Sequence, residues 1–165
     1  MIPPKPGVVF DCNVLLQAIV RSDSVADQCL QLAESGAVQL VVSRTTLAEI
    51  TEVLERPAVR AHFPHLTDEI VGAFLIRLQK CSWLERVVPL KFRYSRDPND
   101  EPYINLAVAA NAAYIVSRDR DLLDLMSGYS DDCKEFRQRF RPLKVIEPLE
   151  LLRLARGFPN PPETT

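Results

Sequence analysis

The chain has 165 residues, of which 47% are apolar and 25% are charged, and its formal net charge is −2. These proportions are typical of a globular domain and exclude an intrinsically disordered chain, while the charge excludes an overall field that attracts nucleic acid. No apolar run approaches the length of a bilayer span and the first residues lack a signal-peptide pattern, so we expect a cytoplasmic protein with no membrane contact.

Strand-like runs alternate with helical patterns along the chain. Short runs rich in Val and Ile predict strands at 7–10, 38–42, 113–117 and 143–147. Helical spacing predicts helices at about 14–20, 24–35, 44–56, 67–80, 100–112, 119–126 and 148–155. Such alternation indicates a mainly parallel sheet covered by helices on both faces. We expect one domain over 1–156, followed by a disordered tail over 157–165 that contains three prolines.

An aspartate follows directly on the first predicted strand. Asp11 lies between the run 7–10 and another apolar segment, where a lone carboxylate is costly without a partner, so we favour a functional role for it. In an open parallel sheet, ligands bind beyond the carboxyl ends of the strands, near the point where the strand order reverses. Asp119 follows the predicted strand 113–117 in a similar way. If the two strands are neighbours, both carboxylates converge on one spot.

Further acids occur near the starts of two predicted helices. Glu49 lies within two turns of the start of the helix 44–56, for which Ser43 is a good N-cap residue. Asp97, Asp100 and Glu101 surround the start of another helix. Structural roles compete with functional ones here, because acids at helix starts complement the helix dipole. Asp97 followed by proline is more typical of a cap than of a ligand, Asp119 is also a possible cap, and Glu49 a possible solvated residue.

A cation would explain why these acids share one edge of the sheet. Converging carboxylates repel one another unless a cation compensates them, and oxygen ligands without His or Cys favour Mg²⁺ or Mn²⁺ over zinc. The two histidines, His62 and His65, lie in a turn away from the strand ends. The cysteines show no CxxC spacing, which argues against a zinc site and a disulfide framework: Cys12, Cys29, Cys81 and Cys133. A carboxylate-bound divalent cation suits phosphoryl chemistry.

With its motifs in this order, the chain resembles the PIN-domain family of metal-dependent ribonucleases, most closely the branch of toxins from toxin–antitoxin pairs. The resemblance covers about residues 8–152. Its carriers are "VVFDCNVLL", "VVSRTTLAEITEVLERP", "RDPNDEPYINLAVAANAAYIVSRDRDLLDL" and "LKVIEPLELL". It implies an α/β fold, a three-layer sandwich around a five-stranded parallel sheet in the order 3-2-1-4-5. In that order the strands that precede Asp11 and Asp119 are neighbours.

The resemblance also implies the catalytic residues. The first, second and fourth acids of the family fall on Asp11, Glu49 and Asp119, and either Asp100 or Glu101 serves as the third. We choose Asp100 because the "DPxD" pattern is typical of this branch, and Asp11, Asp100 and Asp119 are then the metal ligands. The supporting polar positions fall on Asn13, Ser43 and Ser117. Cys12 stands where the family more often has Thr.

The implied activity is endonucleolytic hydrolysis of RNA with Mg²⁺ or Mn²⁺ as cofactor. The resemblance further implies the toxin role in a type II toxin–antitoxin pair, a cognate antitoxin as partner, and a homodimer. Two other interpretations remain open. A phosphatase of the haloacid-dehalogenase type also begins with a strand that ends in Asp, but it needs a second Asp where this chain has Asn13, and a following Gly-Thr. The other is a non-catalytic binding module with the same fold.

Two basic segments are candidates for RNA contact. The segment 91–96 has three basic residues interleaved with aromatic ones, and the segment 134–144 has five basic residues against one acid. Such mixtures can stack bases and pair with phosphates, and we assign RNA binding to Arg137, Arg139 and Arg141. The alternative is that both segments are solvated faces whose aromatic residues turn into the core.

Overall fold

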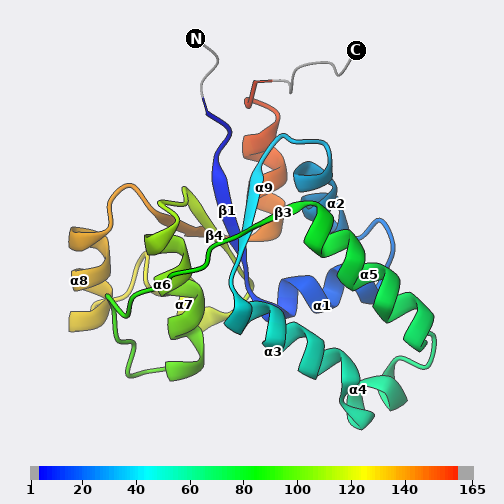
Figure 1. The fold of residues 1–165 in the computed structure, drawn as a ribbon. Coiled ribbons are helices and arrows are strands. Elements are labelled where there is room, and N and C mark those ends of the chain that lie inside the picture. Colours follow the sequence, from blue (N-terminus) through cyan, green and yellow to red (C-terminus); the bar gives the residue numbers. More distant parts are fainter. Residues whose placement is uncertain (1–3, 160–165) are drawn as a thin grey trace.

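Five short parallel strands form the centre of the structure, a computed structural model that describes residues 4–159 (Figure 1). They are β1 (Gly7–Phe10), β2 (Gln39–Val42), β3 (Ser82–Leu84), β4 (Tyr114–Val116) and β5 (Lys144–Ile146). Their order is β3-β2-β1-β4-β5 and every neighbouring pair is parallel. This confirms the predicted α/β class and the order 3-2-1-4-5. From β1 the chain first adds β2 and β3 on one side of this strand and then adds β4 and β5 on its other side. The strand order therefore reverses between β1 and β4.

Helices cover both faces of this sheet (Figure 1). They are α1 (Cys12–Val20), α2 (Val25–Glu34), α3 (Arg44–Glu55), α4 (Pro57–His62), α5 (Asp68–Lys80), α6 (Glu101–Ala109), α7 (Arg120–Leu123), α8 (Asp131–Arg139) and α9 (Pro148–Ala155). A 3₁₀ turn, η1 (Pro98–Asp100), precedes α6. Within residues 4–159, no helix is both long and apolar enough to cross a bilayer.

The alternation of side chains along β1 divides the core into two clusters. Val8 and Phe10 point to the side of α1, α2, α3, α5 and α9, whereas Val9 points to the side of α6, α7 and α8. Successive residues of a strand face opposite sides of a sheet, so a strand buried on both faces is apolar throughout. The chain therefore leaves β1 at the middle of the molecule, and the residue that follows this strand is enclosed from both sides.

The observed elements differ from the sequence expectations at four places. The pattern analysis missed β3, which is a three-residue edge strand with little alternation. It also missed α8 and α4, whose sequences are polar or short. The helix expected at about 100–112 ends at Ala109, because Asn111 adopts a left-handed conformation with φ of 51°. All four cysteines are free thiols. Phe158 packs against the core, and the rest of the predicted tail, 160–165, lies outside the described residues.

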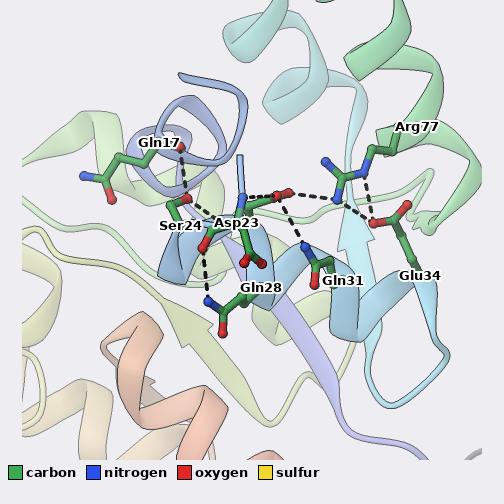
Figure 2. A network of polar contacts seen from close by, with 8 residues as sticks. Gln17, Asp23, Ser24, Gln28, Gln31, Glu34 and Arg77 are labelled. Carbon is green, nitrogen blue, oxygen red and sulfur yellow. Dashed lines mark hydrogen bonds and ion pairs between the residues drawn. The ribbon is translucent and has the colours of Figure 1, made fainter. Parts of the chain in front are cut away.

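A polar network fixes α5 and the turn before α2 to one another (Figure 2). Its centre is Asp27, whose side chain is 8% exposed and lies 2.8 Å from the guanidinium of Arg77. The main-chain N–H of Asp23 donates to the same carboxylate at 2.7 Å, and Arg77 also contacts Glu34 at 2.5 Å. A buried carboxylate is tolerated only when it is paired and hydrogen-bonded. Arg77 therefore holds α5 beside α2, on the side of the sheet away from α6 to α8.

Candidate active site

Asp11 is the buried residue at the carboxyl end of β1. It is 4% exposed and caps α1 by accepting a hydrogen bond from the N–H of Val14 at 2.9 Å. The hydroxyl of Ser117 donates to its other carboxylate oxygen. Burial raises the pKa of Asp11, and the nearby charges of Asp119 and Glu49 raise this pKa further against those two hydrogen bonds. The burial that the sequence predicted for Asp11 is confirmed.

Ser117 joins Asp11 to Asp119. Phe10 of β1 pairs with Val116 of β4, so the residues after the two strands leave the sheet side by side. The Ser117 hydroxyl donates to Asp11 and accepts from the N–H of Asp119 at 2.9 Å. Because neighbouring parallel strands end at the same edge of the sheet, Asp11 and Ser117 are in contact although they are 106 positions apart in the sequence.

Asp119 also belongs to a cluster of four carboxylates. Asp97, Asp100, Asp119 and Asp121 each offer a carboxylate oxygen, and these oxygens all lie within 4.8 Å of one another. Asp97 also caps η1 by accepting from the N–H of Asn99 at 3.1 Å, as its sequence context predicted. The sequence analysis did not identify Asp121. Its signal was its place two residues after Asp119, whose carboxylate accepts a hydrogen bond from the N–H of Asp121 at 2.8 Å.

Asp100 is the most confined member of this cluster. It is 7% exposed, and its Oδ2 is buried with no hydrogen-bond partner in the described part of the chain. Burial raises its pKa to about 7, with further contributions from the charges of Asp119 and Asp97. A buried carboxylate oxygen without a partner lowers the stability of the fold, and a bound proton or cation would remove this penalty.

Glu101, the alternative third acid, has a different role. Its carboxylate accepts a hydrogen bond from the N–H of Tyr94 at 2.8 Å and thereby holds the segment that precedes η1. Glu101 lines a separate hollow of about 240 Å³, together with Ser43. Asp100, by contrast, lines the same hollow as Asp11. This placement supports the choice of Asp100 as the third acid.

Glu49 reaches the site from α3 and is held by a tyrosine. The hydroxyl of Tyr103, a residue that is 2% exposed, donates to Oε2 of Glu49. The sequence analysis missed Tyr103, although residues three apart on a helix face the same way and Tyr103 follows Asp100 at that spacing. Cys12 lies nearby, and burial raises the pKa of its thiol to about 12, so it stays a neutral thiol.

The predicted acids meet in one hollow of about 300 Å³. Its lining includes Asp11, Glu49, Asp97, Asp100 and Asp119, together with Asn13, Tyr103 and Arg56. A larger hollow of about 650 Å³ lies between α2, α5 and β3. Among the described residues, Glu34 is the only carboxylate that lines it, and Glu34 is already paired with Arg77. We therefore take the smaller hollow, where the charges converge, as the candidate active site and call it the acidic pocket.

The predicted supporting residues divide into two groups. Ser117 and Asn13 lie at the acidic pocket, the first bonded to Asp11 and the second exposed on its rim. Ser43 instead caps α3 in a reciprocal arrangement with Thr46, whose N–H donates to the Ser43 hydroxyl at 3.1 Å. Ser43 therefore orients the helix that carries Glu49, and it does not line the acidic pocket.

The three arginines of the segment 134–144 lie outside the acidic pocket. The guanidinium of Arg137 donates to the carbonyls of Leu125 and Gly128 at 2.9 and 2.8 Å, and Arg139 pairs with Glu135 at 2.7 Å. Nε of Arg141 donates to the carbonyl of Arg137 at 3.1 Å. The aromatic residues of the two basic segments turn inward, with Phe92, Tyr94 and Phe136 buried and Phe140 packed against them. RNA contact by these arginines stays a prediction.

The residues of the acidic pocket fit a hard divalent cation. Their charged donors are carboxylate oxygens, the ligands that Mg²⁺ and Mn²⁺ prefer, and no histidine lines the pocket. The buried, unpartnered Oδ2 of Asp100 is the clearest sign, because a bound cation would supply the partner that this atom lacks among the described residues. The cluster of four aspartates could thus bind a metal ion.

Comparison with known proteins agrees with this geometry. A family model described as "PIN domain" matches residues 7–121. The matched range runs from β1 into α7 and contains Asp11, Glu49, Asp100 and Asp119. A search of curated proteins found no match.

Proposed function

Because the chain belongs to the PIN-domain family, whose fold is that of a nuclease, we propose that it is an endoribonuclease that hydrolyses RNA phosphodiester bonds with Mg²⁺ or Mn²⁺. One observation carries the proposal. Five carboxylates line one pocket at the switch point of the sheet, and the most buried of the clustered ones, Asp100, has an oxygen without a partner. At neutral pH such a pocket destabilises the fold unless a cation compensates its charge.

The residues of the acidic pocket have different roles in the proposed reaction. Asp11, Asp100 and Asp119 would hold the metal ion, which when bound lowers the pKa of a water and stabilises charge on the phosphate. The Ser117 hydroxyl orients Asp11 through one carboxylate oxygen. The Tyr103 hydroxyl donates to Oε2 of Glu49, and Oε1 of Glu49 has no hydrogen-bond partner among residues 4–159. Oε1 of Glu49 is then the atom that orients a water in the pocket and accepts its proton.

The finer biological role is proposed from the sequence motifs. These resemble the toxin branch of the family, so we propose that the protein is the toxin of a type II pair, acts in the cytoplasm as a homodimer, and is neutralised by a cognate antitoxin. An antitoxin that covers the acidic pocket would exclude RNA from it. A neighbouring reading frame for a small DNA-binding protein with a disordered tail would support this role.

Cleavage of single-stranded RNA in Mn²⁺, Mg²⁺ and EDTA tests the proposed activity. We expect internal cleavage with either metal ion and none in EDTA, because the carboxylates repel both one another and phosphate without a cation. Release of phosphate from a small ester such as p-nitrophenyl phosphate is the matched control. Ester hydrolysis without RNA cleavage would instead favour a phosphatase. Loss of both activities would favour a non-catalytic binding module, and either result would contradict the proposal.

Salt titration of RNA binding tests the arginines of the segment 134–144. Arg137 is left in place because its guanidinium holds two main-chain carbonyls. If Arg139 and Arg141 each contact one phosphate, their replacement by Ala should weaken binding and lower the salt slope, by about 0.7 for each contact on a single strand. Cleavage at saturating RNA should change little. An unchanged slope would assign the phosphate contact to another surface, with the segment 91–96 next.

A further inference from the structure

The acidic pocket contains one basic side chain. Among residues 4–159, its lining carries five carboxylates and only Arg56 as a cation. One divalent ion compensates two of the negative charges, and an entering phosphodiester adds another. Phosphate binding at such a site therefore needs a local positive charge in addition to a metal ion. Among the described residues that line the pocket, Arg56 is the one that can supply it, whereas Arg96, outside the lining, is paired with Asp121 and Asp124.

The position of Arg56 follows from α3. Arg56 is the C-cap residue of this helix, and Glu49 precedes it by seven positions, which is about two helical turns. Residues at this spacing share one face of a helix, and Val53 between them lines the same pocket. One face of α3 thus presents a carboxylate at the depth of the pocket and a guanidinium at its rim, where the Arg56 side chain is 52% exposed.

The partner of Arg56 is one that a phosphate can replace. Its Nε and Nη2 donate to the two carboxylate oxygens of Glu52 at 2.9 and 2.7 Å. Both side chains are more than half exposed, at 52% and 60%, and exposed pairs of this kind contribute only about 0–1 kcal/mol. The two donors in a fork match the oxygens of a phosphate as well as those of a carboxylate.

We propose that Arg56 is a substrate-positioning residue, which exchanges the Glu52 carboxylate for a phosphodiester of the RNA chain at the acidic pocket. This inference rests on the proposed ribonuclease function. Glu52 then acts as a competitor for the guanidinium in the free protein. The proposal makes the two members of the ion pair oppose one another: removing Arg56 weakens RNA binding, and neutralising Glu52 strengthens it.

Steady-state cleavage of single-stranded RNA provides the first measurement. Arg56→Ala should raise KM about tenfold, the effect of a lost charged hydrogen bond, with a smaller change in kcat. Arg56→Lys should recover part of this loss because it keeps the charge but not the fork. Glu52→Gln should lower KM. Arg153→Ala is the matched control, because Arg153 forms an exposed pair with Glu150 on α9 and does not line the acidic pocket.

RNA binding by the Asp11→Asn variant provides a measurement that does not depend on cleavage. On this background Arg56→Ala should weaken binding and lower the salt slope by about 0.7, whereas Glu52→Gln should strengthen binding. Arg56 could instead act only by stabilising the end of α3 through its ion pair with Glu52. Arg56→Ala and Glu52→Gln would then change KM and RNA affinity in the same direction, and this result would overturn the proposal. Equal RNA affinities of the Asp11→Asn protein with and without Arg56→Ala or Glu52→Gln would also overturn the proposal. A wild type that never cleaves RNA but shows the opposed effects would contradict only the nuclease function.

Discussion

Replacing Asp11 by Asn should abolish RNA cleavage while the protein stays folded. We expect a loss of about a thousandfold or more, because a predicted metal ligand at the centre of the pocket loses its charge. The same change should raise the thermal midpoint in EDTA. Asp11 is 4% exposed and its pKa is raised first by burial and then by Asp119 and Glu49, so its charge destabilises the metal-free fold. Asn keeps an oxygen that accepts from the N–H of Val14.

Cleavage in Mn²⁺ and thermal unfolding in EDTA at pH 8 check these two expectations separately. Asp131→Asn is a suitable control, since Asp131 is an exposed acid in the first turn of α8 and does not line the acidic pocket. The control should leave both cleavage and the midpoint near those of the wild type. A fully active Asp11→Asn variant would rule out the mechanism. A midpoint that falls in EDTA would show that the Asp11 carboxylate stabilises the fold through its hydrogen bonds.

The metal-free protein should lose stability as the pH rises from 5 to 8, and a divalent ion should restore it. Burial raises the pKa of Asp100 to about 7, whereas an unfolded aspartate titrates near its ordinary value. The stability that a raised carboxyl pKa contributes is fully present below the unfolded pKa and is lost as the pH rises through the folded pKa. For Asp100 this amounts to roughly 2–3 kcal/mol between pH 5 and pH 8, or several degrees in the thermal midpoint.

Thermal midpoints in EDTA and in Mn²⁺ at both pH values test this expectation. The ion binds deprotonated ligands in the folded state, so it should raise the midpoint more at pH 8 than at pH 5. In EDTA, Asp100→Asn should be more stable than the wild type at pH 8 and should show a smaller pH dependence. In the Asp11→Asn, Asp119→Asn double variant the effect of Mn²⁺ should disappear. An equal stabilisation of the double variant would place the ion elsewhere in the molecule.

Local sequence was sufficient to identify the site residue that follows the first strand. Asp11 could be identified because it interrupts an apolar run, and the cost of burying a carboxylate does not depend on the details of the fold. The alternation of strands and helices predicted a parallel sheet with covered faces, whereas the strand order came only from the resemblance to the PIN-domain family. The edge strand β3 escaped detection because three residues at a sheet edge carry no periodicity.

What only the tertiary structure decided is which groups share the acidic pocket and which partners they have. Asp100 and Glu101 are adjacent in sequence, yet one faces the cluster with a free oxygen and the other accepts from the N–H of Tyr94. Tyr103 and Arg56 join the pocket through helix faces whose direction depends on how α6 and α3 pack. The sequence of the segment 134–144 suggested a basic patch. In the fold, α8 buries Phe136 in the core, and the guanidinium of Arg137 donates to main-chain carbonyls. A sequence pattern specifies the cost of burying each residue. The partner that offsets this cost comes from another element, 106 positions away for Asp11 and Ser117, and is set only when those elements pack together.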